Sequence, residues 1–232
     1  MPTRTVASIL AIALLATTRV GLGADFDVGR VTLRVTDDGW ASIATSGDGL
    51  PFSGDRSGTI EIVKRSLLLV DGAEHFRAAL VVSATPGTPA AHVQWPEDCR
   101  SQDNVYALDA RPASGEARDC LRLTGLVAID RSLATDAPAI ASELAGRKII
   151  APTAGYVVLD EVALANGTFV AVEALIAADV ELPHGSGIPR SLPAGIGAQT
   201  FAWGQRLAEA ARSSIHSLSG LLVVPPVTAK SN

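Results

Sequence analysis

Asn166-Gly167 interrupts an apolar run from Tyr156 to Ile176, and this interruption restricts the local structure more than any other feature of the sequence. Asn-Gly favours the two positive φ angles of a type I′ turn, which joins two antiparallel strands through a two-residue loop. A helix is the competing interpretation, because Ala, Leu and Glu are frequent in the run. We predict a β-hairpin here.

The hairpin leads to one geometric hypothesis about a site. If Ala165 pairs with Thr168, then Asp160 faces Glu173 across the two strands. Carboxylates directly opposite one another lie about 5 Å apart at Cβ and repel, a cost that is tolerated where the pair binds a cation or shares a proton. Retaining glycosidases also use a close carboxylate pair. The alternative is that both side chains diverge into water at the open end of the hairpin.

The first half of the chain alternates short apolar runs with turn residues, which predicts strands. In the run from Val31 to Val35, apolar and polar residues alternate with the period of a half-buried strand. We expect further strands at residues 40–45, 59–70, 76–83 and 121–129, and a glycine-rich loop at residues 46–58. Such strands are typical of an antiparallel sheet or sandwich.

Helices are expected in the second half. Asp136 and Pro138 indicate the start of a short helix that ends near Gly146, and residues 199–218 carry an apolar stripe with helical spacing. Trp203 falls near that stripe, so we expect it to anchor the core. The predicted fold class is α+β: a mainly antiparallel β-sheet or sandwich with a C-terminal packing helix.

Residues 1–24 have the layout of a secretory signal peptide. Arg4 precedes an uncharged, mostly apolar run over residues 6–18, and small residues lead to Ala24. The run is shorter than the roughly 20 residues that a membrane-spanning helix needs, so an uncleaved anchor is the lesser alternative. We predict cleavage after Ala24, a single globular domain over residues 25–224, a polar tail over residues 225–232, and no transmembrane segment in the mature chain.

Cys99 and Cys120 are the two cysteines of the chain. In an exported protein, an even pair is most simply a structural disulfide. The pair lacks the Cys-x-x-Cys spacing of redox motifs and has no neighbouring histidine pair for a metal. We therefore predict a Cys99–Cys120 disulfide and a periplasmic or extracellular location.

Charge excludes two classes of partner. Without the two arginines of residues 1–24, 17 of the 19 basic residues remain against 24 acidic ones, a formal charge of −7 (17 − 24). An acidic chain offers no basic surface for nucleic acid, and anionic lipid is disfavoured for the same reason. The partners that remain are an unknown protein or small molecule in the cell envelope.

The sequence contains no strong catalytic, cofactor or metal motif. His184-Gly185-Ser186-Gly187 brings a histidine and a serine together, but it lacks the Gly-x-Ser-x-Gly elbow of α/β-hydrolases. The four histidines are scattered without metal-ligand spacing. We assign no catalytic, cofactor-binding or metal-ligating residues and predict no cofactor.

Two functional hypotheses remain. The first is an exported, non-enzymatic protein that binds an unknown ligand or partner. The alternative is an exported hydrolase that uses the Asp160–Glu173 pair or Ser186 with a histidine. An enzyme should gather these groups in one concave pocket with shifted pKa values, whereas an interaction protein should expose an apolar patch or a sheet edge. Whether the chain is an enzyme is left open, with the binding protein favoured.

Overall fold

The computed structural model describes residues 23–52, 58–87, 92–95, 99–102, 104–110, 117–183, 192 and 195–227. In chain order, the elements of these residues are β1 (Asp25–Val28), β2 (Val31–Val35), β3 (Trp40–Phe52), β4 (Gly58–Val70), β5 (Phe76–Ala84), β6 (Val105–Asp109), β7 (Arg118–Ala128), α1 (Ile129–Asp136), α2 (Pro138–Arg147), β8 (Ala154–Ala163), β9 (Phe169–Ala177), α3 (Ala198–His216) and β10 (Leu221–Val224). The chain is mostly antiparallel sheet with a C-terminal helix packed on it, which confirms the predicted α+β class.

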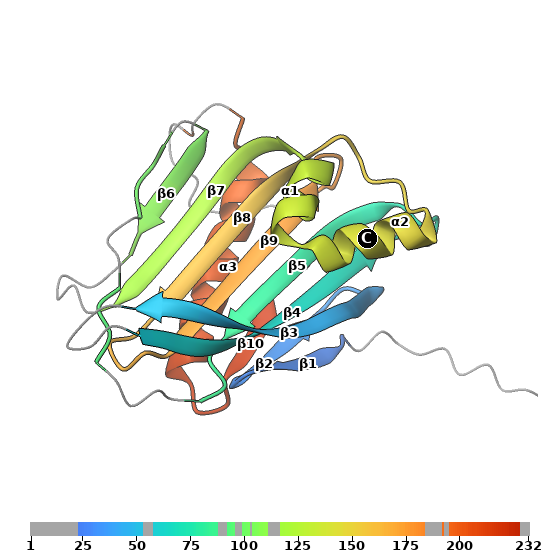
Figure 1. Cartoon of the computed structure of the whole chain (residues 1–232). Helices are drawn as coiled ribbons and strands as arrows, with labels where there is room; N and C mark the ends of the chain where they lie inside the picture. The colour runs from blue at the N-terminus through green and yellow to red at the C-terminus, as the bar shows by residue number, and fades with distance from the viewer. Residues whose placement is uncertain are drawn as a thin grey trace, which may run out of the picture.

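The strands form a large and a small sheet (Figure 1). The large sheet has seven antiparallel strands in the order β3-β4-β5-β9-β8-β7-β6. In the small sheet β2 lies between β1, which is antiparallel to it, and β10, which is parallel to it. Because β8 and β9 pair directly, the predicted hairpin is confirmed.

Each face of the large sheet is covered by different elements. Helix α3 lies behind the sheet in Figure 1, and α1 and α2 lie in front of it. We call these the α3 face and the α1 face. On the α3 face, a Cβ added at Gly204 would lie 2.8 Å from a methyl carbon of Leu123 and 3.3 Å from one of Val158, so glycine permits this close approach of helix and sheet.

Trp203 joins α3 to the end of the chain. Its side chain is fully buried, and its Nε1 donates to the carbonyl oxygens of Pro225 at 3.3 Å and Pro226 at 3.0 Å. A buried indole needs such an acceptor for its N–H group. The prediction that Trp203 anchors the core is confirmed.

A smaller apolar cluster covers the opposite face near the β8–β9 turn. Trp95 stacks on Phe169 with ring centroids 5.7 Å apart, and its Nε1 donates to the carbonyl of Leu164 at 2.9 Å. Ile60 and Ile62 of β4 belong to the same cluster. The segment that carries Trp95 therefore closes one end of this face, while α1 and α2 cover another part of it.

Three boundaries differ from the prediction. Strand β3 continues from Trp40 to Phe52 through residues expected to form a loop, because β4 supplies hydrogen-bonding partners as far as Gly58 opposite Phe52. Asp136 ends α1, and the N-cap of α2 is Ala137, although α2 does begin at Pro138. Helix α1 begins at Ile129, so the strand predicted over residues 121–129 ends one residue earlier, at Ala128.

The packed part of the chain also extends beyond residue 224. Val227 is fully buried, and its backbone N donates to Asp37 Oδ2 at 2.8 Å. The predicted polar tail therefore contributes at least this residue to the core, and residues 228–232 lie outside the described part of the chain.

The proposed signal peptide lies outside the described residues, apart from Gly23 and Ala24. Strand β1 begins at Asp25, directly after the predicted cleavage position, so cleavage there would leave every described strand intact. Among the described residues, no helix has both the length and the apolar character needed to cross a bilayer.

Cys99 and Cys120 form the predicted disulfide, with their Cα atoms 5.7 Å apart. Cys120 is fully buried in β7, so the bond ties a residue outside the named strands to the large sheet. The sequence separation is 21 residues, and chain-entropy theory assigns a loop of this size roughly 3 kcal/mol of stability.

Loss of this disulfide is expected to lower the thermal midpoint by about 6–12 °C, since 1 kcal/mol corresponds to about 2–4 °C for a chain of this size. The measurement is calorimetry of the oxidised protein, the reduced protein and the Cys99→Ala/Cys120→Ala double variant. Reduction should have no effect on the double variant. Equal midpoints for all three samples would show that the bond does not stabilise the fold.

Candidate functional site

The loop between β8 and β9 decides whether Asp160 and Glu173 can act together. Leu164 N donates to Thr168 O, and Gly167 N donates to Leu164 O, both at 2.9 Å, so the loop holds three residues instead of the predicted two. Gly167 has a φ of +83°, whereas Asn166 is not among the residues with positive φ. This is the pattern of a type I turn followed by a left-handed residue.

The extra loop residue shifts the register by one. Asp160 pairs with Val172, and Glu173 pairs with Leu159. Because successive side chains of a strand point to opposite faces, Asp160 lies on the α3 face and Glu173 on the α1 face. The predicted facing of the two carboxylates is therefore wrong, and they form no common site.

Asp160 is fully buried, and neither of its carboxylate oxygens has a hydrogen-bond partner among the described residues. Burial raises the pKa of this carboxyl to about 8, and the negative charge of Asp119 adds to the rise, while Arg212 opposes it. Asp160 is therefore mostly protonated at neutral pH. A carboxyl group kept neutral in this way is a common mark of a functional position.

Asp119 and Arg212 form an ion pair beside Asp160. Arg212 of α3 donates from Nε to Asp119 Oδ2 at 2.5 Å and from Nη2 to Oδ1 at 3.0 Å. The hydrogen bonds to Asp119 raise the pKa of Arg212 above its usual value. The pair lies in a cavity of about 290 Å³ between the β6–β7 edge and α3.

Glu173 lies in a much tighter place on the opposite face. It borders a cavity of about 10 Å³ together with Ser132 and Asp136 of α1. Burial raises the pKa of Glu173 to about 7, and the charges of Asp136 and Glu161 add to this, while Lys64 opposes it. A space of this size holds at most about one water molecule, so it cannot accept an organic substrate.

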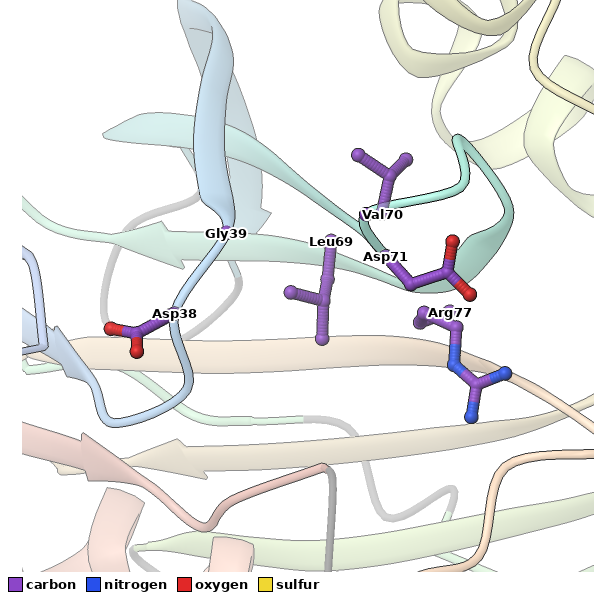
Figure 2. A pocket seen from close by; sticks show the side chains of 7 residues that line it. Asp38, Gly39, Leu69, Val70, Asp71 and Arg77 are labelled. Atoms are coloured by element: carbon purple, nitrogen blue, oxygen red, sulfur yellow. The ribbon is translucent and has the colours of Figure 1, made fainter. Parts of the chain in front are cut away.

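A larger opening lies at the end of the large sheet, and we call it the sheet-end cleft (Figure 2). Its volume is about 660 Å³, within the range of roughly 300–1,000 Å³ that small-molecule sites occupy. The lining comes from the β2–β3 turn, the end of β4 with the turn after it, and β5: Asp38, Gly39, Leu69, Val70, Asp71, Gly72 and Arg77.

Charges of both signs flank an apolar centre in this cleft. Figure 2 shows Leu69 between Asp38 on one side and Arg77 on the other. Asp38 is exposed, and within the described part of the chain it forms no hydrogen bond or ion pair. Arg77 is about a quarter exposed and has one long contact, 3.5 Å from Nη1 to Oδ2 of Asp179. Both groups can therefore turn to a ligand.

Asp71 is the third charged residue of the cleft, and its carboxylate is already engaged. Its Oδ1 accepts the backbone N–H groups of Ala73 at 2.9 Å and His75 at 3.0 Å, which holds the turn after β4. These bonds and the neighbouring His75 ring lower the pKa of Asp71. Asp71 Oδ2 also lies 3.3 Å from Nδ1 of His75, but no described hydroxyl or thiol hydrogen-bonds to that ring. The pair lacks the nucleophile of a catalytic triad.

Comparisons with known proteins do not distinguish between a binding protein and a hydrolase. No protein-family model, curated protein or solved structure matches the chain. The described residues also contain no group of three or more His, Cys, Asp or Glu side chains that could hold a metal ion. His184 and Ser186, the other candidates from the sequence, lie outside the described residues.

Sequence reasoning missed both the cleft and the Asp119–Arg212 pair. Asp38 and Asp71-Gly72 are ordinary turn residues, and no local pattern shows that two turns meet at one end of a sheet. Arg212 lies 93 residues from Asp119. Their contact depends on how α3 crosses the sheet, and no spacing within the sequence records that.

Proposed function

We propose that this is an exported, non-enzymatic protein that binds a small zwitterionic molecule in the sheet-end cleft. The observation that carries the proposal is the placement of Asp38 and Arg77 on opposite sides of Leu69 in a ligand-sized cleft. Asp38 is suited to an ammonium group and Arg77 to a carboxylate, and Leu69 and Val70 offer apolar contacts between them. A free amino acid or a dipeptide has this chemistry.

Export is part of the proposal. It is supported by the signal-peptide pattern of residues 1–24 and by the Cys99–Cys120 disulfide, a bond typical of oxidising compartments. The carboxylate-pair form of the hydrolase alternative loses support, because Asp160 and Glu173 lie on opposite faces. Ser186, the nucleophile of its other form, lies outside the described residues.

The cleft offers a matched pair of variants for the test. A Cβ at Gly72 would have no atom within 4 Å, so Gly72→Trp places an indole in the cleft without a backbone clash. Gly146 in α2 is equally open and does not line the cleft, so Gly146→Trp is the control. Two further variants, Asp38→Asn and Arg77→Gln, each remove one charge.

We expect L-alanyl-L-leucine or L-leucine to raise the melting temperature of wild type and Gly146→Trp, but not of Gly72→Trp. A ligand at a hundredfold excess over its dissociation constant stabilises by about 2.7 kcal/mol. The mono-charged analogues 4-methylpentanoate and 3-methylbutylammonium should give smaller shifts. Equal shifts for wild type and Gly72→Trp, or no shift with any probe, would contradict the proposal.

A further inference from the structure

The outer edge of β3 is the longest edge of the described strands that has no neighbouring strand. β3 is the first strand in the order of the large sheet and spans Trp40–Phe52, so β4 alone pairs with it. Residues 45–49, in its second half, are exposed. The unpaired N–H and C=O groups of such an edge can bond to another strand. The edge of β3 is therefore a candidate surface for pairing with another chain.

The opposite edge of the large sheet is covered by the chain itself. Ser101 Oγ accepts the backbone N–H of Ala107 in β6 at 3.0 Å, and the backbones of Gln102 and Val105 exchange hydrogen bonds of 3.0 Å. The disulfide lies near the start of this covering segment. Within the described part of the chain, the backbone of β3 bonds to no segment other than β4. One edge of the sheet is therefore closed, and the other is open.

Pro51 shows which residues of β3 turn their backbone groups to the open edge. Proline has no N–H group, so in a paired strand it takes a position that points away from the neighbouring strand. The register between β3 and β4 is regular through this half of the strand, and inward and outward positions alternate. The backbones of Thr45, Gly47 and Gly49 therefore also point outward. Gly49 agrees with this, because its N–H bonds to Oδ1 of Asp48 at 2.7 Å.

The outward-facing residues suit pairing of β3 with a second copy of itself. Antiparallel pairing of two identical strands needs a two-fold axis, and Thr45 and Gly49 are placed symmetrically about Gly47. With the axis at Gly47, the two Gly47 residues exchange N–H···O=C bonds, as residues directly opposite one another do in an antiparallel ladder. Each Thr45 then donates its N–H to the carbonyl of the partner's Gly49. The same short segment supplies both sides of the interface.

The charges beside the axis also complement one another. The carboxylate of Asp48 forms an ion pair with Lys64 of β4, and this bond and the N–H of Gly49 lower the pKa of Asp48. Lys64 pairs with Ser46, which would face the partner's Asp48. Each lysine thus lies on the same face as the partner's carboxylate, two strand spacings or about 10 Å away. Each copy brings one acid and one base to the axis, so the paired edges carry no net charge.

We propose that two copies of this chain pair antiparallel through β3, with the two-fold axis at Gly47, and join their large sheets into one continuous sheet. A strand edge of this length buries less than the roughly 1,600 Å² of a standard interface. We therefore expect a dimer that forms at high protein concentration and dissociates on dilution. The sheet-end cleft lies before the other end of β3, so it stays open in the dimer.

Sedimentation velocity of the oxidised protein between about 5 and 500 µM tests the proposal, and we expect a monomer–dimer equilibrium within this range. Gly47→Pro removes the N–H at the axis but no bond to β4, and it should be monomeric throughout. A Cβ at Gly47 would have only the carbonyl oxygen of Ile62 within 4 Å, at 4.0 Å. Gly47→Ala keeps the N–H and is the matched control, which should dimerise like wild type. Circular dichroism checks that both variants are folded.

A charge exchange gives a second test that does not depend on a proline. Asp48→Lys places two further lysines beside Lys64 of both copies, so we expect the dissociation constant of the dimer to rise at least tenfold. The double variant Asp48→Lys/Lys64→Asp restores opposite charges within each copy and across the axis. It should dimerise like wild type. A double variant as weak as Asp48→Lys would contradict the pairing about Gly47.

Hydrogen exchange locates the interface. In wild type, the amides of Thr45 and Gly47 should exchange more slowly at about 500 µM than at about 20 µM protein, because they become bonded only in the dimer. In Gly47→Pro, exchange at Thr45 should not depend on concentration. The inference is overturned if wild type stays monomeric up to about 500 µM, which would leave this edge to a strand of another protein. It is equally overturned by a dimer that leaves Thr45 and Gly47 unprotected or that persists in Gly47→Pro.

Discussion

Replacing Asp160 with asparagine is expected to stabilise the protein, and by more as the pH rises. The folded protein holds the pKa of Asp160 at about 8, above the ordinary value of 3.8. Unfolding lets the carboxyl ionise freely, so its ionisation favours the unfolded state. The contribution of this residue to stability is greatest below pH 4, falls as the pH rises towards 8, and is constant above that.

The expected change in the free energy of unfolding is large. The pKa of Asp160 differs by about four between the folded and unfolded states, and each pKa unit is worth about 1.4 kcal/mol. Asparagine has nearly the same shape and does not ionise, so Asp160→Asn should raise the free energy of unfolding at pH 8 by roughly 3–5 kcal/mol. Urea denaturation at pH 5 and pH 8 measures this for wild type, Asp160→Asn and the control Glu61→Gln, which changes an exposed carboxyl on β4. An advantage of Asp160→Asn that does not grow between the two pH values would show that Asp160 is not buried as described.

Trp203→Ala should have the largest destabilising effect of any substitution in α3. The side chain is fully buried and also holds the segment after β10 through Pro225 and Pro226. Truncation of a buried tryptophan typically costs about 3–5 kcal/mol, from lost contacts and the cavity that is left. We expect a loss of this size in the free energy of unfolding, measured by urea denaturation at pH 6.

Trp203→Phe separates the two contributions of this side chain. Phenylalanine keeps much of the apolar contact but has no N–H for the proline carbonyls, and a lost hydrogen bond of this kind costs about 1–3 kcal/mol. Hydrogen exchange at β10 should increase in both variants. Unchanged exchange at β10 in Trp203→Ala would mean that the indole does not hold the C-terminal segment.

Most of the helices and strands were predictable, because each is determined by a pattern of residues within a short stretch of the sequence. Alternation of apolar and polar residues indicated β2, and turn residues separated the later strands. The stripe around Trp203 indicated α3. Local patterns did not show that β10 runs parallel to β2, since that pairing depends on α3 returning the chain to the small sheet.

The prediction that Asp160 faces Glu173 was wrong because of one extra residue in the β8–β9 loop. Asn-Gly suits a two-residue loop in which both residues have positive φ. Here Asn166 is the middle residue of a three-residue loop and does not have a positive φ, and its Oδ1 accepts the backbone N–H of Thr168 at 3.0 Å. A shift of one residue moves a side chain to the other face of the sheet. Sequence reasoning therefore selected two carboxyl groups with raised pKa values, Asp160 and Glu173, but placed them together wrongly.

The most direct test of the central claim is to map the position of a zwitterionic ligand on the ¹⁵N-labelled protein by amide chemical shifts. With L-alanyl-L-leucine as the probe, we predict that the largest changes lie at Asp38 and Gly39, at residues 69–72 and at Arg77. They should disappear in Gly72→Trp and persist in Gly146→Trp. Shifts centred elsewhere on the protein, or none at millimolar ligand, would contradict the claim that the sheet-end cleft is the binding site.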